Sequence, residues 1–77
     1  MGKAPRVTAR DVVKVLEQTG FTLSRSRGSH FIYAREDGRR ATVPVHGSDI
    51  LHPKTLAAIF RDADLTIDEF EERLKGK

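Results

Sequence analysis

Two glycine-containing turns, Arg27-Gly28 and Asp37-Gly38, constrain the fold more than any other feature of this chain. Each turn separates short segments that are rich in β-branched and aromatic residues, a pattern typical of hairpins. The segments predict three consecutive antiparallel strands, at residues 21–26, 29–35 and 39–45. Because Pro44 cannot donate a ladder hydrogen bond, the third strand is expected at an edge and the second in the middle.

The register of both hairpins follows if each turn is a two-residue loop. Arg25 then lies opposite His30, and His30 lies opposite Val45. Side chains alternate between the faces of a sheet, so one face collects most of the apolar residues and is expected to be buried. That face holds Phe21, Leu23, Ile32, Ala34, Ala41, Val43 and Val45, whereas Phe31 and Tyr33 are expected on the opposite, exposed face.

Helices are predicted before and after the three strands along the chain. Thr8 and Asp11 have the spacing of a capping box, and Gly20 is placed to end that first helix in a left-handed conformation. Pro53 suits the first position of a second helix. The expected apolar faces are Ala9, Val12, Val13 and Leu16 in the first helix, and Leu56, Ile59, Phe60 and Ala63 in the second.

A third helix is predicted near the end of the chain. Thr66 and Glu69 form a second capping box, with Leu65 and Phe70 as its hydrophobic staple and Ile67, Phe70 and Leu74 as its apolar face. The order α-β-β-β-α-α predicts an α+β domain of two layers, with all helices on one face of a three-stranded antiparallel sheet. At 77 residues the chain is expected to be a single domain, 1–77.

Composition limits the chemistry. The chain has no cysteine, which excludes a thiol nucleophile and thiolate zinc sites and is typical of cytoplasmic proteins. No segment is apolar and long enough for a membrane span. Residues 1–40 hold nine Lys and Arg against four Asp and Glu, whereas residues 41–77 hold five against seven. The basic first half indicates a polyanionic partner or a merely solvated surface.

His30 is the first candidate for chemistry. The expected register places it at the turn end of the buried face, beside Arg25, and next to a glycine turn with accessible backbone N–H groups. A neighbouring cation disfavours the imidazolium, so a neutral ring able to act as a base is expected. The alternative on local grounds is a histidine at the core edge that is satisfied by a backbone carbonyl.

Five arginines cluster around the two hairpins, and guanidinium groups match phosphate geometry. They favour a nucleic-acid backbone as ligand, with the alternative that they only keep the hairpins soluble. Glu36 is placed to pair across the turn with one of them, Arg39. The cluster comprises Arg25, Arg27, Arg35, Arg39 and Arg40.

Phe31 and Tyr33, expected to be exposed, are predicted to face a protein partner. The alternatives are that they stack on bases, or that the chain ends or a second copy of the protein cover them. His46 and His52 complete the histidines. The three have no helical spacing of metal ligands and no supporting cysteine, so no metal site is predicted.

Several of these features together resemble the HicA-type toxin family of toxin–antitoxin pairs. The similarity runs from the first helix to Phe70, and the Gly-Ser-His turn together with the Asp-Gly…Thr-Val-Pro-Val-His segment is its most specific part. The segments that carry it are Gly20-Phe21, Arg27-Gly28-Ser29-His30, residues 37–46, Leu56 with Ile59, and residues 65–70.

The resemblance implies a fold like that of double-stranded-RNA-binding domains, with an α-β-β-β-α core. It implies an mRNA interferase that cleaves RNA and arrests translation, with His30 as the catalytic residue. It also implies a cognate HicB-type antitoxin as the protein partner. No cofactor and no membrane association is implied, and the free toxin is expected to be a cytoplasmic monomer.

The hypothesis is therefore metal-independent RNA cleavage, in which His30 exchanges a proton with the substrate. The phosphate-binding set is predicted to be Arg25, Arg27, Gly28, Ser29, Arg39 and Arg40. The second proton-transfer group is unassigned, with His46 as a weak candidate. The alternatives are a non-catalytic RNA-binding module of the same fold and a protein whose only function is to bind another protein through Phe31 and Tyr33.

Overall fold

A computed structural model describes residues 7–45 and 50–76. The order of elements is α-β-β-β-α-α, as predicted. The elements are α1 (Ala9–Gln18), β1 (Thr22–Arg27), β2 (His30–Ala34), β3 (Arg40–Pro44), α2 (Pro53–Ala63) and α3 (Ile67–Gly76).

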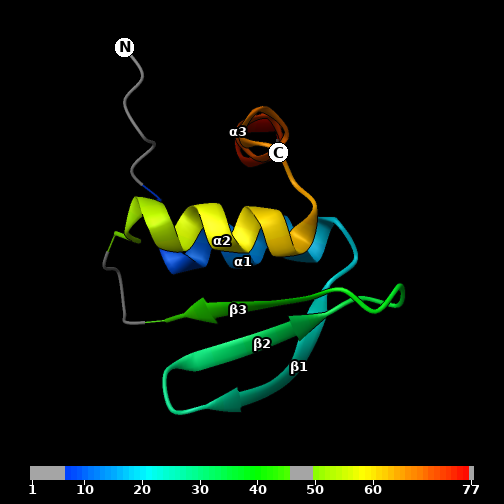
Figure 1. The fold of residues 1–77 in the computed structure, drawn as a ribbon. Helices are drawn as coiled ribbons and strands as arrows, with labels where there is room; N and C mark the ends of the chain where they lie inside the picture. Colours follow the sequence, from blue (N-terminus) through cyan, green and yellow to red (C-terminus); the bar gives the residue numbers. More distant parts are fainter. Residues whose placement is uncertain (1–6, 46–49, 77) are drawn as a thin grey trace.

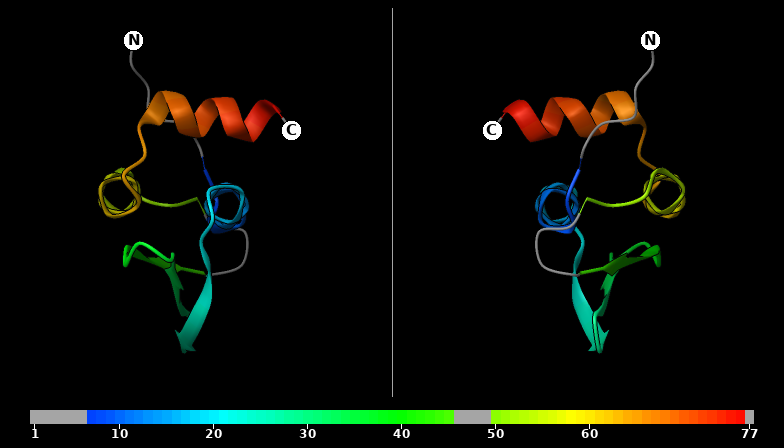
Figure 2. Two further views of the ribbon diagram at one scale, coloured as in Figure 1. Left: turned by 90° about the vertical axis from the view of Figure 1, so that its right-hand side faces the viewer. Right: turned by 90° about the vertical axis from the view of Figure 1, so that its left-hand side faces the viewer.

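The strands form one antiparallel sheet in the order β1-β2-β3, and all three helices lie on the same side of it (Figures 1 and 2). The predicted α+β fold class is confirmed, and its α-β-β-β-α core is consistent with a fold like that of double-stranded-RNA-binding domains. Pro44 lies in an edge strand, as expected.

The third helix does not pack on the sheet, so the expectation of two layers is wrong. Figure 2 shows α3 crossing above α1 and α2, on the side of these helices away from the strands. The rings of Phe60 in α2 and Phe70 in α3 lie 5.0 Å apart at 42°. Phe70 is fully buried, whereas Ile67, expected on the same apolar face, is 45% exposed. The helices α1 and α2 therefore form a middle layer.

Both ends of α1 are as the sequence predicts. The Thr8 hydroxyl accepts a bond from the backbone N–H of Asp11, and the Asp11 carboxylate accepts one from that of Thr8. At the other end Gly20 has a φ of 98°. The N–H of Gly20 donates to Glu17 and that of Phe21 to Leu16, the two bonds of a Schellman motif.

The ends of α2 and α3 also rest on local side chains. Pro53 starts α2, and Nδ1 of His52 accepts a hydrogen bond of 3.1 Å from the backbone N–H of Lys54. The helix ends at Asp64, which is in the left-handed region with φ 59° and ψ 50°. The predicted capping box of Thr66 and Glu69 is present at the start of α3.

The first hairpin turns one residue later than predicted. Its loop is Gly28-Ser29, so that Arg27, and not Arg25, lies opposite His30. Gly28 has a φ of 57° and Ser29 is not in the left-handed region, a pattern that fits a type II′ turn. The register of β1 then shifts at a bulge between Leu23 and Arg25.

The second hairpin has a longer loop than predicted. Arg35 receives a hydrogen bond from Gly38 and donates one to Arg39, so residues 36–38 form a three-residue turn. Gly38 takes the positive φ, 93°, that such a turn requires. Tyr33, and not Ala34, lies opposite Ala41.

These shifts reverse the predicted faces of β2, because a slip of one residue exchanges the two sides of a strand. Tyr33 is buried and Phe31 is half-buried against the core, so their expected exposure is wrong. Ile32, Ala34 and His30 lie on the opposite face instead. Leu23, expected inside, is 50% exposed.

The inner face of β3 agrees with the prediction, with Ala41 and Val43 buried and Val45 half-buried against the core. The core lies between the sheet, the middle layer and α3. Its members are Val7, Ala9, Val12, Val15, Leu16, Phe21, Tyr33, Ala41, Val43, Leu51, Leu56, Ile59, Phe60, Ala63 and Phe70.

Candidate nucleic-acid interface

The face of the sheet turned away from the helices, which we call the open face, carries most of the candidate residues. No described helix covers it (Figures 1 and 2). The register arranges its side chains in three rows across the strands in the order β1, β2, β3. The rows are Arg27, His30, Pro44; then Arg25, Ile32, Thr42; then Thr22, Ala34, Arg40.

His30 is the first residue of the central strand and is exposed on the open face. Its neighbours across the strands are Arg27 and Pro44. The expected place beside Arg25 on the buried face is therefore wrong, but a cationic neighbour is present because Arg27 takes that position. Residues paired in this way have Cβ atoms about 5 Å apart, so the imidazole and the guanidinium can act on one ligand.

The turn that precedes His30 is attached to the end of β3. The backbone N–H of Val45 donates a hydrogen bond of 2.7 Å to the carbonyl of Ser29. Gly28 is exposed, and no atom lies within 4 Å of the position that a Cβ would occupy. The positive φ, and not a close contact, therefore accounts for the glycine, and the turn stays open to a ligand.

Three arginines of the open face are free to bind an anion. The ion pairs found among residues 7–45 and 50–76 engage Arg35 and Arg39, and none engages Arg25, Arg27 or Arg40. All three are exposed, and no Asp or Glu is part of the three rows. The open face therefore presents positive charge around His30 that no described acidic side chain neutralises.

The other two arginines fasten the β2–β3 turn to the helices. Arg35 donates to both carboxylate oxygens of Asp37, at 3.1 and 2.8 Å, and to the carbonyl of Thr19. Arg39 donates to the carbonyl of Asp62. Thr19 and Asp62 lie at the C-terminal ends of α1 and α2, where cations are favourable. Arg39, predicted to bind phosphate, is thus held apart from the open face.

Asp37 is the centre of this arrangement, which we call the turn clamp (Arg35, Asp37 and Arg39). Hydrogen bonds from the Arg35 guanidinium and the Arg39 backbone N–H lower the pKa of Asp37 to about 2. The Arg35 guanidinium also lies 4.7 Å from the centre of the Phe21 ring. Arg39 pairs with Asp37 and Asp64, and not with Glu36 as expected.

The inner face near His30 is apolar. Phe31, next to His30 in the chain, lines a groove of about 790 Å³ together with Val13, Tyr33 and Val45. Burial, and to a smaller extent the charge of Glu17, raises the pKa of Tyr33. Phe31 and Tyr33 are thus on the opposite side of the sheet from the arginines and cannot stack on a ligand bound there.

Of the two remaining histidines, only His52 lies among the described residues. His52 is occupied as the N-cap of α2. His46, the weak candidate for the second proton transfer, lies outside the described residues.

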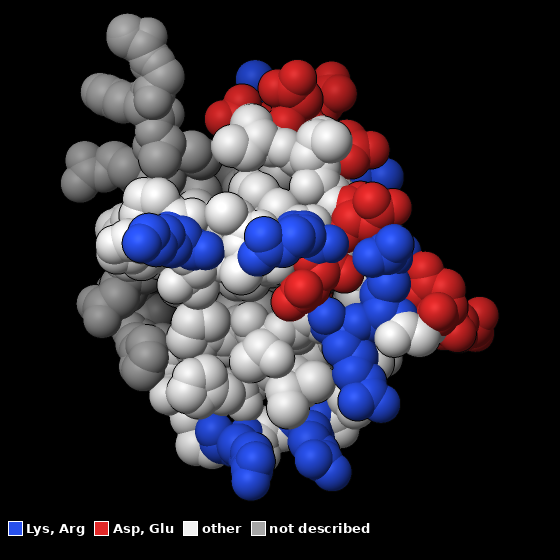
Figure 3. Space-filling view, viewed as in Figure 1, with Lys and Arg blue, Asp and Glu red and all other residues white. Residues whose placement is uncertain are grey.

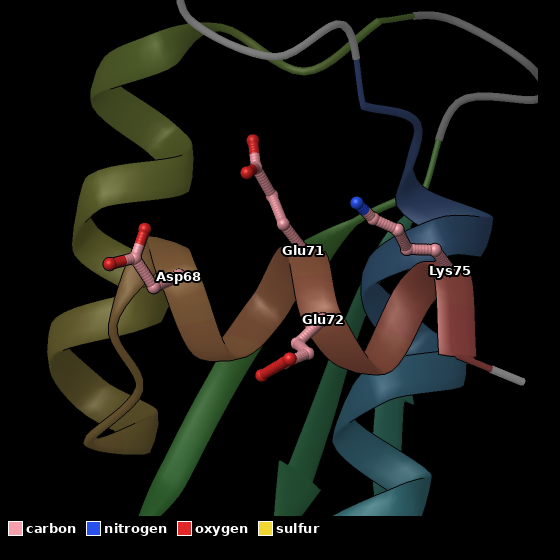
Figure 4. A pocket seen from close by; sticks show the side chains of 4 residues that line it. All are labelled: Asp68, Glu71, Glu72 and Lys75. Atoms are coloured by element: carbon pink, nitrogen blue, oxygen red, sulfur yellow. The ribbon is translucent and has the colours of Figure 1, made fainter.

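Nothing in the described part of the chain suggests a metal site. Its residues contain no group of three His, Asp or Glu side chains suited to a metal ion. Figure 4 shows a shallow hollow on α3, where Asp68, Glu71 and Glu72 point in different directions. These carboxylates do not converge on one point.

Charge is separated across the molecule. Figure 3 shows acidic side chains gathered over α3, acidic and basic side chains together around the β2–β3 turn, and basic side chains below the sheet and along α2. A polyanion would therefore approach the sheet end of the molecule.

Within the described ranges, no helix has the length and apolar character needed to cross a membrane.

A comparison with known protein families identifies the family of this chain. Residues 9–65 match the family described as the HicA toxin of bacterial toxin–antitoxin systems. The chain belongs to the HicA toxin family. No curated protein sequence matches it closely enough to count as a relative.

The match includes every row of the open face and ends before α3. This HicA protein is thus the toxin of a toxin–antitoxin pair, and an antitoxin is implied as its partner. Thr42 was missed by the sequence reasoning as a member of the open face. Its position between Ala41 and Val43, both predicted to point inward, was the signal that could have found it.

Proposed function

We propose that this HicA toxin is a metal-independent endoribonuclease that cleaves mRNA at the open face and so arrests translation. The observation that carries the proposal is the position of His30. In a member of the HicA family, this exposed histidine stands on an uncovered sheet face beside Arg27 and close to Arg25, neither of which is paired with a described acidic residue.

The substrate brings its own nucleophile. His30 takes the proton of a ribose 2′-hydroxyl, the 2′-oxygen bonds to the adjacent phosphorus, and the bond from phosphorus to the 5′-oxygen breaks. The departing 5′-oxygen takes up a proton, from His30 or from a group not yet assigned. The guanidinium groups of Arg25 and Arg27 stabilise the charge that builds on the phosphoryl oxygens, and the backbone of Gly28 and Ser29 offers further donors.

The test is cleavage of a labelled single-stranded RNA in EDTA. His30→Ala should lower the rate by about 10²–10⁴-fold, the usual contribution of a general acid–base group. His52→Asn is the matched control, because asparagine is also a good N-cap and His52 caps a helix of the middle layer and is not part of the open face. DNA of the same sequence should remain intact, since it lacks the 2′-hydroxyl.

Cleavage that survives His30→Ala, in protein free of contaminating nuclease, would show that His30 is not the catalytic residue. RNA that is bound in a salt-dependent manner but stays intact would favour the second candidate, a non-catalytic RNA-binding module.

We further propose that the partner is a HicB-type antitoxin that covers the toxin. The free toxin is expected to act as a monomer in the cytoplasm. Sedimentation of the toxin alone would measure whether it is a monomer, and sedimentation with its antitoxin would measure whether the two proteins form a complex.

A further inference from the structure

The free arginines of the open face lie in two separate places. Arg25 and Arg27 are on β1, in the rows of Ile32 and His30, whereas Arg40 is on β3, in the row of Ala34. Strands lie about 4.8 Å apart and advance about 3.4 Å per residue. The same spacings separate the backbones of Arg27 and Arg40 by roughly 16 Å on the diagonal of the face.

The backbones of Arg27 and Arg40 are therefore far enough apart for their guanidinium groups to bind different phosphates. Stacked nucleotides advance about 3.4 Å along a strand, so a 16 Å diagonal corresponds to roughly four or five of them, and to fewer when the strand is extended. A group bound at Arg40 is therefore a different one from a group bound beside His30.

We propose that Thr42 and Arg40 form a distal subsite for an RNA phosphate other than the one cleaved at His30. Thr42 is exposed in the middle row, two residues from Arg40 on β3 and diagonal to His30 on β2. Its short, β-branched side chain has few rotamers to lose, and its hydroxyl can donate to a phosphate oxygen. This inference rests on the proposed cleavage of RNA.

The composition of the face favours a path across the strands and not along β1. A strand that followed β1 from Arg27 through Arg25 would end at Thr22 and leave Arg40 unused. The central positions between β1 and β3 are aliphatic, Ile32 and Ala34, and present little obstacle to a backbone that crosses them.

The subsite can be tested by the dependence of binding on RNA length. We would use 2′-O-methyl RNA, which keeps the phosphates but lacks the nucleophilic hydroxyl, with the full chain as it exists. A strand of 12 nucleotides would be measured by fluorescence anisotropy and a trinucleotide by chemical-shift titration. Arg40→Gln should weaken binding of the longer strand by about fivefold and that of the trinucleotide by less than twofold. Arg27→Gln should weaken both.

Salt and matched threonine variants separate the contributions of the two residues. Arg40→Gln should reduce the slope of log affinity against log salt by about 0.7, the value for one phosphate of a single strand. Thr42→Val should weaken binding of the longer strand about threefold without changing the slope. Thr42→Ser keeps the hydroxyl and should bind the longer strand as tightly as the wild type does. Thr22→Val is the control on β1 and should have no effect.

Equal losses for both lengths in Arg40→Gln, or a larger effect of Thr22→Val than of Thr42→Val, would overturn the distal subsite. Neither result concerns cleavage. Conversely, cleavage that persists in His30→Ala would overturn the proposed function while leaving the binding comparison interpretable.

Discussion

At the scale of single residues, Asp64 has an unfavourable backbone conformation. It is the only non-glycine residue of the described chain with a positive φ, and it takes the position after a helix that glycine usually fills. The left-handed region costs an ordinary L-residue roughly 1–2 kcal/mol, somewhat less for Asp. The ion pair of Asp64 with Arg39 is long, 3.9 Å, and exposed, so it offsets little of that cost.

Asp64→Gly should therefore raise the free energy of unfolding by about 0.5–1 kcal/mol, as measured by urea denaturation. Ala57→Gly, at an exposed position inside the same helix, is the control for a new glycine. It should lower the free energy of unfolding by about 0.5–1 kcal/mol. A loss of stability in Asp64→Gly would mean that the ion pair outweighs the backbone cost.

The carboxylate of Asp37 gives the turn clamp a dependence on pH. Its pKa is lowered from 3.8 to about 2 by the bonds from Arg35 and Arg39. A lowered pKa in the folded state stabilises the fold above pH 3.8, and this contribution is lost as pH falls towards 2. Asp37→Asn should be less stable than the wild type at pH 6, and the difference should shrink between pH 4 and 2. A difference that is constant over this range would show that the charge is not involved.

At the scale of elements, α3 contributes one fully buried side chain, Phe70, to the core, and Leu74 packs against the core only in part. Phe70 is fully buried and packs at a tilt against Phe60, whereas Ile67 at the start of the helix is 45% exposed. The family match ends at residue 65, so the packing of α3 lies beyond what the match describes. The helix covers the side of the middle layer that the sheet does not reach (Figure 2).

Phe70→Ala should lower the free energy of unfolding by about 3–5 kcal/mol, because it leaves a cavity in the core. Ile67→Ala should cost less than about 1 kcal/mol, because half of its surface is already in water. If Phe70→Ala unfolds the chain outright, Phe70→Leu provides a milder measurement in the same direction. Equal losses at the two positions would contradict the packing described for α3.

At the scale of the whole molecule, the separation of charge should control how RNA binds. Three arginines that no described carboxylate pairs lie on the open face, and the acidic side chains of α3 lie beyond the middle layer of helices (Figure 3). At physiological salt the Debye length is about 8 Å, so charges on α3 are screened from the open face.

Three phosphate contacts to a single strand predict a slope of log affinity against log salt of about −2. The combined variant Asp68→Asn, Glu71→Gln and Glu72→Gln should leave that slope unchanged. Binding of labelled 2′-O-methyl RNA across a salt series measures both. A slope that steepens when the acidic residues are neutralised would show that α3 lies close to the bound RNA.

The sequence by itself determined the features that depend on neighbours in the chain. The capping boxes of α1 and α3, the glycine that ends α1, Pro53 at the start of α2 and the edge position of Pro44 are all where the residues predict them. Each depends on hydrogen bonds or steric limits within a few residues, so no tertiary contact is needed to recognise them. The choice of His30 and its arginine-rich surroundings also came from the sequence and the family resemblance.

Only the tertiary structure decided which face of β2 His30 occupies. Loops of two residues at Arg27-Gly28 and Asp37-Gly38 and the observed loops at 28–29 and 36–38 are both compatible with the local sequence. The observed register buries Tyr33 and half of Phe31, which have more apolar surface than Ile32 and Ala34. The turn clamp anchors the longer loop to the ends of α1 and α2. Because these contacts join residues far apart in the chain, the strand pattern alone could not place His30 on the open face.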